Sequence, residues 1–409
     1  MTTHSDDVTH LAECSACRQR YAANVVPFDP AARRNREREF TSVAAKLERE
    51  RDESSDVVAR YLRDTPTDEW SRLAEMPDLR NNAALEQMSE EVRRRLDRQS
   101  TEALAIANVA TSISETLPPG AYPSIVLAQL RSTAWRDRAN ALRYAARYDE
   151  ALQSIERAES IVQQFVTLPY DHAVVQLVKG MILAQIGRLD EAYVVLSECR
   201  NIFREHHDTR RFQQAALAEA NALYEATKYT EARRVYEDLL REPLDVEYQA
   251  RIHNNLGYCA TQLGDFVQAN IHFSEAIAKF TDLGFTDEIP RTERGAGLVF
   301  IARGQIATGL GHLENARRAF RINGMVEEAA LCALNIAAVL VERGDDSDAR
   351  SIIQTIADEL AAAGLDKNAI AAVVRLRDAI DMDDATVETV RTVHALIEVL
   401  RDSVHESAN

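Results

Sequence analysis

A histidine and two cysteines near the N-terminus form a group whose spacing is typical of metal binding. His10, Cys14 and Cys17 stand in the order H-x3-C-x2-C within the segment THLAECSACRQRY. On a helix, residues i, i+4 and i+7 lie along one face, so an imidazole and two thiolates can converge on one zinc ion. A closed structural zinc site takes four protein ligands. The nearest candidate for the fourth is His4, and otherwise water or a ligand from another chain would fill that position.

Two other interpretations of this segment stay open. It can be a vestigial site that still forms a short helix, or Cys14 and Cys17 can be a redox-active pair. If zinc binds, we expect a structural role, because the ion would fold a short segment that lacks a core of its own. For Cys199, Cys259 and Cys332 we expect core packing, because they occupy small-residue positions of helical patterns.

The rest of the sequence carries no familiar signature of catalysis. It has no G-x-G-x-x-G loop, no P-loop, no G-x-S-x-G elbow and no H-E-x-x-H pair, so we expect no enzymatic activity. The net charge of −17 disfavours nucleic acid as a partner, since an acidic chain repels phosphate backbones. The N-terminus lacks the pattern of a signal peptide, and the longest apolar-rich run, 329–341, is too short to span a bilayer. We therefore expect a cytoplasmic protein without a membrane partner.

The composition predicts a helical protein, because 14 glycines and 10 prolines are few for 409 residues. One phrase recurs along it: a small residue or Gly, a polar residue, an aromatic residue or Leu, two further residues, then Ala. The phrase ends at Ala151, Ala192, Ala232, Ala269, Ala316 and Ala349, with spacings of 41, 40, 37, 47 and 33. Each copy lies between two helical patterns, so the sequence predicts an array of helix pairs.

The clearest copy is ARIHNNLGYCATQLGDFVQANIHFSEAIAKF. Gly264 is expected to end its first helix, where a left-handed residue costs little. Phe266 then packs into the corner, and Ala269 lets the second helix approach closely. The apolar faces of the two helices are Ile252, Leu256 and Cys259 in the first, and Ala269, Phe273, Ala276, Ile277 and Phe280 in the second.

This copy resembles the tetratricopeptide repeat family, whose unit of about 34 residues pairs two helices. The matching residues of the clearest copy are Leu256, Gly257, Gly264, Phe266, Ala269, Phe273 and Ala276. Looser matches are Trp135 and Tyr148 in the first copy, Gly180, Gly187 and Ala192 in the second, and Gly304, Gly311 and Ala316 in the fifth. Most spacings exceed the family unit, so we expect longer helices or wider loops. The resemblance implies an all-α solenoid of antiparallel helix pairs.

The flanks of the array are also helical in pattern. We predict a zinc-finger-like segment at 1–30, a charged helix at 31–63, a helical pair at 64–124, about six repeats at 125–378, and a C-terminal capping helix and tail at 379–409. This arrangement resembles a group of bacterial cytoplasmic tetratricopeptide proteins. The first segment is similar to zinc-associated anti-sigma motifs, whose fourth ligand normally lies further upstream.

The resemblance also implies which residues face the inner, concave side of the solenoid. Such Arg, Asn and Tyr side chains suit a peptide, since Asn pairs with backbone amides, Arg with carboxylates, and Tyr packs at low entropic cost. An ordinary wetted surface is the alternative. The implied residues are Arg136, Asn140 and Arg143 in the first copy, Asn221, Tyr224 and Glu225 in the third, and Arg251, Asn254, Tyr258 and Gln262 in the fourth.

These observations favour a non-enzymatic scaffold or adaptor that binds a protein or peptide in its groove. One alternative is a regulator that sequesters a sigma factor or another transcription factor through the N-terminal segment. Another is a peptide-sensing receptor. The sequence leaves the partner and the oligomeric state open.

Overall fold

The computed structural model describes residues 30–54, 56–96, 99–165, 169–363, 367–381 and 386–408. These residues form α-helices and two 3-10 helices, and no strand occurs among them. His4, His10, Cys14 and Cys17 lie outside the described residues, so the zinc site stays a prediction. Within the described part of the chain no three His, Cys, Asp or Glu side chains are grouped as metal ligands would be.

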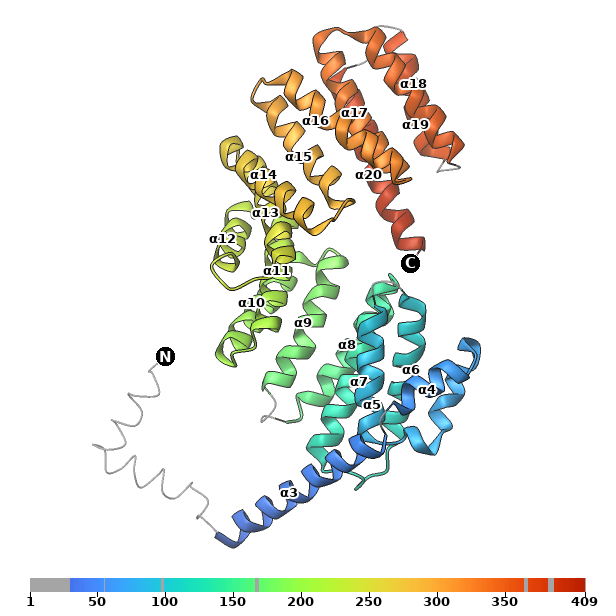
Figure 1. The fold of residues 1–409 in the computed structure, drawn as a ribbon, viewed down its shortest axis with the longest axis vertical. Coiled ribbons are helices and arrows are strands. Elements are labelled where there is room, and N and C mark those ends of the chain that lie inside the picture. The colour runs from blue at the N-terminus through green and yellow to red at the C-terminus, as the bar shows by residue number, and fades with distance from the viewer. Residues whose placement is uncertain are drawn as a thin grey trace, which may run out of the picture.

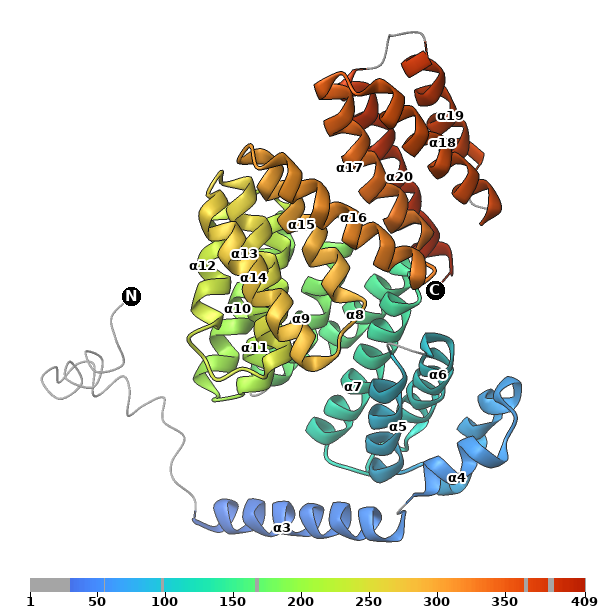
Figure 2. The same ribbon diagram turned by 45° about the horizontal axis from the view of Figure 1, so that its top comes forward.

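The N-terminal third consists of helices that precede the repeated pairs. Its elements are α3 (Pro30–Glu53), α4 (Val57–Asp64), η1 (Thr67–Glu75), η2 (Pro77–Leu79), α5 (Asn82–Arg95) and α6 (Ser100–Thr116). α3 lies at one end of the molecule and extends away from the other helices (Figures 1 and 2). Its last turns are held by Glu50, whose carboxylate accepts a hydrogen bond from the Tyr122 hydroxyl at 2.7–2.8 Å.

The repeated pairs follow in sequence order, each consisting of a first and a second helix. They are α7 (Ser124–Tyr144) with α8 (Tyr148–Val162), α9 (Pro169–Gln185) with α10 (Leu189–Glu205), α11 (Thr209–Glu225) with α12 (Tyr229–Leu239), α13 (Val246–Gln262) with α14 (Phe266–Leu283), α15 (Glu288–Ala302) with α16 (Ile306–Ile322), and α17 (Val326–Arg343) with α18 (Asp346–Ala362). The C-terminal helices are α19 (Lys367–Asp381) and α20 (Val387–Ala408).

Each helix packs mainly against its neighbours in the sequence, and the pairs stack into a curved array (Figure 1). This is the arrangement of a tetratricopeptide-like α-solenoid, so the predicted fold class is confirmed. None of the described helices combines the length and the apolar character that crossing a membrane requires.

The turns set the period of the array. From Gly264 to Gly344, every turn between consecutive helices holds a glycine with a positive φ, and these glycines are spaced 20 residues apart. The turns at Gly187, His207 and Thr227 keep the same spacing. Two helices with their turns therefore occupy 40 residues, longer than the usual unit of about 34. The exception is the interval from Thr227 to Gly264, where α12 has only 11 residues.

The prediction for the fifth copy was wrong in register. GHLENA, which ends at Ala316, does not mark a turn but lies inside α16. The turn comes at Gly304, and the small residue five positions later is Gly309 rather than Ala. A Cβ at Gly309 would come within 2.7 Å of the Gly297 carbonyl oxygen, so α15 and α16 approach too closely for alanine. Ala316 is buried, but as a core residue of the second helix.

The centre of the array packs around the fully buried ring of Phe273. A Cβ placed on Gly257 would lie 2.6–2.8 Å from that ring, and one on Gly295 would lie 2.7 Å from it. The ring therefore fills space that two glycines leave on α13 and α15. The predicted burial of Cys199, Cys259 and Cys332 is confirmed.

The C-terminal helix α20 folds back along α17, the first helix of the last pair (Figure 2). Val390, Val393 and Ile397 are buried in this contact. α20 thus covers part of the side of the array that the first helices form. Its residue Glu398 lines a pocket together with Arg294 of α15.

Candidate functional site

The first helices of the array line two pockets. We call them the arginine pocket, bounded by α5, α7, α9 and α11, and the tyrosine pocket, bounded by α11, α12, α13, α15 and α20. Their volumes are about 410 Å³ and about 520 Å³. α11 contributes side chains to both, so the two pockets lie along one continuous surface.

Five arginines and a single carboxylate, that of Asp137, line the arginine pocket. An apolar wall from α9 faces them. The charged and polar lining residues are Arg93, Arg136, Asp137, Asn140, Arg143, Tyr144, Arg210, Arg211 and Gln214, and the apolar ones are Leu96, Val174, Leu177, Val178 and Met181.

Asp137 is buried and already bonded. Its carboxylate accepts a hydrogen bond from the Ser89 hydroxyl at 2.5 Å and two from the Arg136 guanidinium at 2.6 and 3.0 Å. Arg211 pairs with Asp208 at 2.8 Å and also donates to the Tyr170 hydroxyl. These bonds fix Arg136 and Arg211 in place, because a charge-assisted bond restricts both side chains.

Arg143 is held differently. Its guanidinium donates to the Asn140 side-chain oxygen at 3.0 Å and lies over the Tyr144 ring, 4.3 Å from the ring centre. Arg210 is exposed at the start of α11. Among the described residues, no carboxylate forms an ion pair with either arginine. Both guanidinium groups can therefore take an anionic partner without breaking an existing pair.

The tyrosine pocket contains a chain of hydrogen bonds that joins α11, α12 and α13. The Tyr236 hydroxyl donates to the Asn221 side-chain oxygen at 2.5 Å, and the Asn255 amide donates to both of them at 3.2 Å. The remaining lining residues are Tyr224, Glu225, Tyr258, Arg294 and Glu398. Asn221 is exposed, so its amide group is accessible from the groove.

The tyrosines of this pocket stay protonated at any physiological pH. Burial raises the pKa of Tyr224 to about 12 and raises that of Tyr236 further. Each hydroxyl therefore remains a hydrogen-bond donor and acceptor. Amides, hydroxyls and aromatic rings in one groove can bind a peptide backbone and its side chains.

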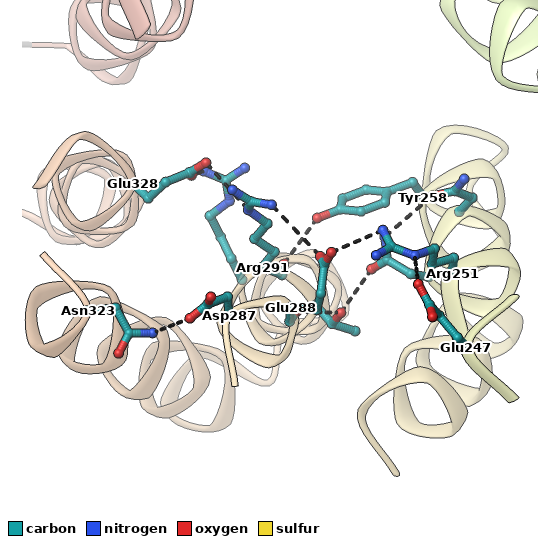
Figure 3. Close-up of polar contacts among 12 residues, drawn as sticks. Glu247, Arg251, Tyr258, Asp287, Glu288, Arg291, Asn323 and Glu328 are labelled. Atoms are coloured by element: carbon teal, nitrogen blue, oxygen red, sulfur yellow. Dashed lines mark hydrogen bonds and ion pairs between the residues drawn. The ribbon is translucent and has the colours of Figure 1, made fainter. Parts of the chain in front are cut away.

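A network of polar contacts joins α13, α15 and α17 (Figure 3). Arg251 pairs with Glu247 on its own helix and with Glu288 on α15, at 3.3 and 3.1 Å. The Thr292 hydroxyl donates to the Asn254 side-chain oxygen at 3.0 Å. The Tyr258 hydroxyl donates to a backbone carbonyl of α15 at 3.1 Å.

The same network continues from α15 to α17. Arg294 pairs with Glu328 at 3.0 Å, and Arg291 lies 3.8 Å from both Glu288 and Glu328 (Figure 3). These bonds hold successive pairs of helices together.

The residues predicted for the inner face therefore divide into three groups. Arg136, Asn140 and Arg143 line the arginine pocket. Asn221, Tyr224, Glu225 and Tyr258 line the tyrosine pocket, and Gln262 lies beside Tyr224. Arg251 and Asn254 lie instead in contacts between helices.

Sequence reasoning missed several lining residues. Arg210 and Arg211 lie in the first turn of α11, which Asp208 caps by accepting a hydrogen bond from the Arg211 backbone amide. An Asp three residues before Arg211 is a helix-start signal that could have placed them on α11. Glu398 had no such signal, because it reaches the pocket through the folding-back of α20.

Comparison with known proteins supports the fold. The tetratricopeptide repeat family model matches residues 217–282, which span most of α11 to α14. No curated protein matches the sequence. A Pyrococcus horikoshii signal transduction ATPase with a tetratricopeptide repeat sensor aligns with a TM-score of 0.58 and 11% identity, covering 88% of this chain and 55% of that one.

Two further solved structures align over almost their full lengths. Apo RapI gives a TM-score of 0.53 at 14% identity, with 85% of this chain and 98% of that chain covered. The apo quorum sensor NprR of B. thuringiensis gives 0.53 at 13%, with 83% and 99% covered. Identities this low establish a shared fold and nothing beyond it.

Proposed function

We propose that this tetratricopeptide-like solenoid is a non-catalytic scaffold that binds a peptide, or an extended segment of a protein, along its inner face. The observation that carries the proposal is the pair of pockets on successive first helices, joined by α11. An extended peptide exposes amides along its length and side chains on alternate sides. The groove offers it Asn221 for the amides, the Tyr224 ring for packing, and arginines for acidic groups.

The solved structures of similar fold add support from their own descriptions. NprR is described as a quorum sensor and the Pyrococcus protein as carrying a repeat sensor. By that analogy the bound segment can act as a signal that changes the solenoid, rather than as passive cargo. Sequestration of a transcription factor would depend on the N-terminal segment, which lies outside the described residues, so it stays a prediction.

The test is selection of peptides from a random display library on the full-length protein. Selected peptides should bind the Tyr224→Leu variant and the Asn140→Ala variant at least about tenfold more weakly, which corresponds to one or two lost contacts. Val267→Ala is the matched control, because Val267 is 56% exposed and lies on the second helix α14. Equal binding to all three variants would place the site elsewhere, and an empty selection would contradict peptide binding.

A further inference from the structure

We infer that the arginine pocket recognises a peptide through adjacent acidic residues flanked by an apolar one. The inference rests on the proposed function and assigns it a ligand chemistry. It concerns one part of the groove only, so peptide binding can hold even where this selectivity does not.

The first step is the contrast between the pocket and the rest of the chain. The protein carries 65 acidic against 48 basic residues, yet one carboxylate faces five arginines in this pocket. Arginines from α5, α7 and α11 meet there, although these helices are separated in the sequence. A positive pocket on a negative molecule attracts an anionic segment locally while the surrounding field disfavours extended polyanions.

The second step is the state of the guanidinium groups. Arg93 is engaged with Glu90, Arg136 with Asp137, and Arg211 with Asp208. Arg143 and Arg210 have no ion-pair partner among the described residues. Arg143 is also oriented in advance, by its bond to Asn140 and its contact with the Tyr144 ring. A guanidinium held in this way loses little rotamer entropy when it forms a bidentate pair with a carboxylate.

The third step is the wall opposite the arginines. Val174, Leu177, Val178 and Met181 of α9 line the same space. Free phosphate gains nothing from such a wall, whereas a peptide can place an aliphatic side chain against it and a neighbouring carboxylate on the guanidinium groups. This favours an acidic peptide segment over inorganic phosphate as the ligand.

The experiment uses the full-length protein and two labelled decapeptides, measured by fluorescence anisotropy. The acidic probe has Leu-Asp-Glu-Leu at its centre, and the neutral probe has Leu-Asn-Gln-Leu in the same flanks. The test variant is Arg143→Gln with Arg210→Gln, which uncovers no described carboxylate. The control variant is Arg72→Gln with Arg343→Gln, whose side chains are 69% and 56% exposed and which changes the net charge equally.

We expect the acidic probe to bind the wild type at least about tenfold more tightly than the neutral probe. The test variant should lose that preference, and the control variant should keep it. Equal affinity for the two probes, or a preference that survives the test variant, would overturn the inference. So would displacement of the acidic probe by millimolar inorganic phosphate to the same extent as by unlabelled peptide.

A separate outcome distinguishes failure of the inference from failure of the proposed function. Suppose that library-selected peptides lack acidic residues, bind the test variant normally and are weakened by Tyr224→Leu. The groove would then bind peptides without acidic selectivity, and only the inference would be wrong.

Discussion

His253 on α13 and His272 on α14 face each other across the centre of the array, with their Nδ1 atoms 3.1 Å apart. At this distance one neutral ring donates a hydrogen bond and the other accepts it. Burial lowers the pKa of His253 to about 4, helped by the neighbouring His272 ring and by Lys279. Burial also lowers the pKa of His272, and Arg233 adds to this effect. Both helices therefore pack best while the two imidazoles are neutral.

This pair predicts a loss of stability in mild acid. In the unfolded chain a histidine binds its proton near pH 6.5, whereas folded His253 does so only near pH 4. The unfolded state thus binds more protons between these values, so stability is complete above pH 6.5 and falls as the pH drops toward 4. Allowing for partial exposure, we expect a loss of about 1–3 kcal/mol. Urea unfolding at pH 7.5 and pH 4.5 measures it.

The variant His253→Gln should reduce that pH dependence, and His206→Gln, at an exposed position, should leave it unchanged. A slope that is identical in wild type and His253→Gln would show that the pair does not carry the effect.

Substitution of glycine by alanine should have opposite effects on stability at two helical positions. One of them packs against the ring of Phe273, and the other faces open space. Gly257→Ala should cost about 1–3 kcal/mol, because its Cβ would overlap a buried ring that cannot move toward Gly295. Gly311→Ala, inside α16 with nothing within 4 Å, should stabilise by about 0.5–1 kcal/mol through helix propensity. Denaturant midpoints measure both. Adding Phe273→Leu to Gly257→Ala should recover part of the loss, and strict additivity of the two would rule out the overlap.

Substitutions at two adjacent residues of α20 test how tightly that helix packs against α17. Ile397 is 1% exposed and Leu396 is 36% exposed. Ile397→Asn should cost about 2–5 kcal/mol, since it removes apolar burial and places an amide in the core. Leu396→Asn should change stability by less than about 1 kcal/mol. Hydrogen exchange should show faster exchange in α20 and α17 for the first variant alone, and similar exchange in both variants would contradict the packing.

The N-terminal segment predicts bound zinc in the purified full-length protein. His10, Cys14 and Cys17 supply three suitable ligands, so near-stoichiometric zinc is expected by elemental analysis, and Cys14→Ser should abolish it. Cys332→Ser is the control, because Cys332 is buried far along the chain. Absence of zinc from the wild-type protein would contradict the prediction. An oxidised Cys14–Cys17 pair would then favour the redox interpretation.

Much of the fold could be predicted from the sequence because its turns are local. Gly264 followed by Phe266 and Ala269 specifies a left-handed turn and a close helix contact without help from distant residues. The register of the fifth copy could not be predicted in this way, because Gly309 stands where the other copies have alanine. The correct register depends on how closely α15 approaches α16, which is a tertiary property.

The site could be predicted only in part, for the same reason. The repeat register placed Arg143 and Tyr224 on the first helices, where they line pockets. It could not show that Arg251 pairs with Glu288, 37 positions along the chain. Nor could the apolar stripe of the last helix show that its partner is α17.

The shared helix α11 has a consequence for the length of any ligand. It presents Arg210 and Gln214 to one pocket, and Asn221 and Glu225, eleven positions further along, to the other. At 1.5 Å of rise per residue this offset is about 16 Å, which an extended chain covers in about five residues. The spacing of these residues along α11 therefore sets the minimum length of a peptide that contacts both pockets. A shorter peptide can fill either pocket but cannot bridge them, so affinity should rise in a step, rather than gradually, once a ligand exceeds that length.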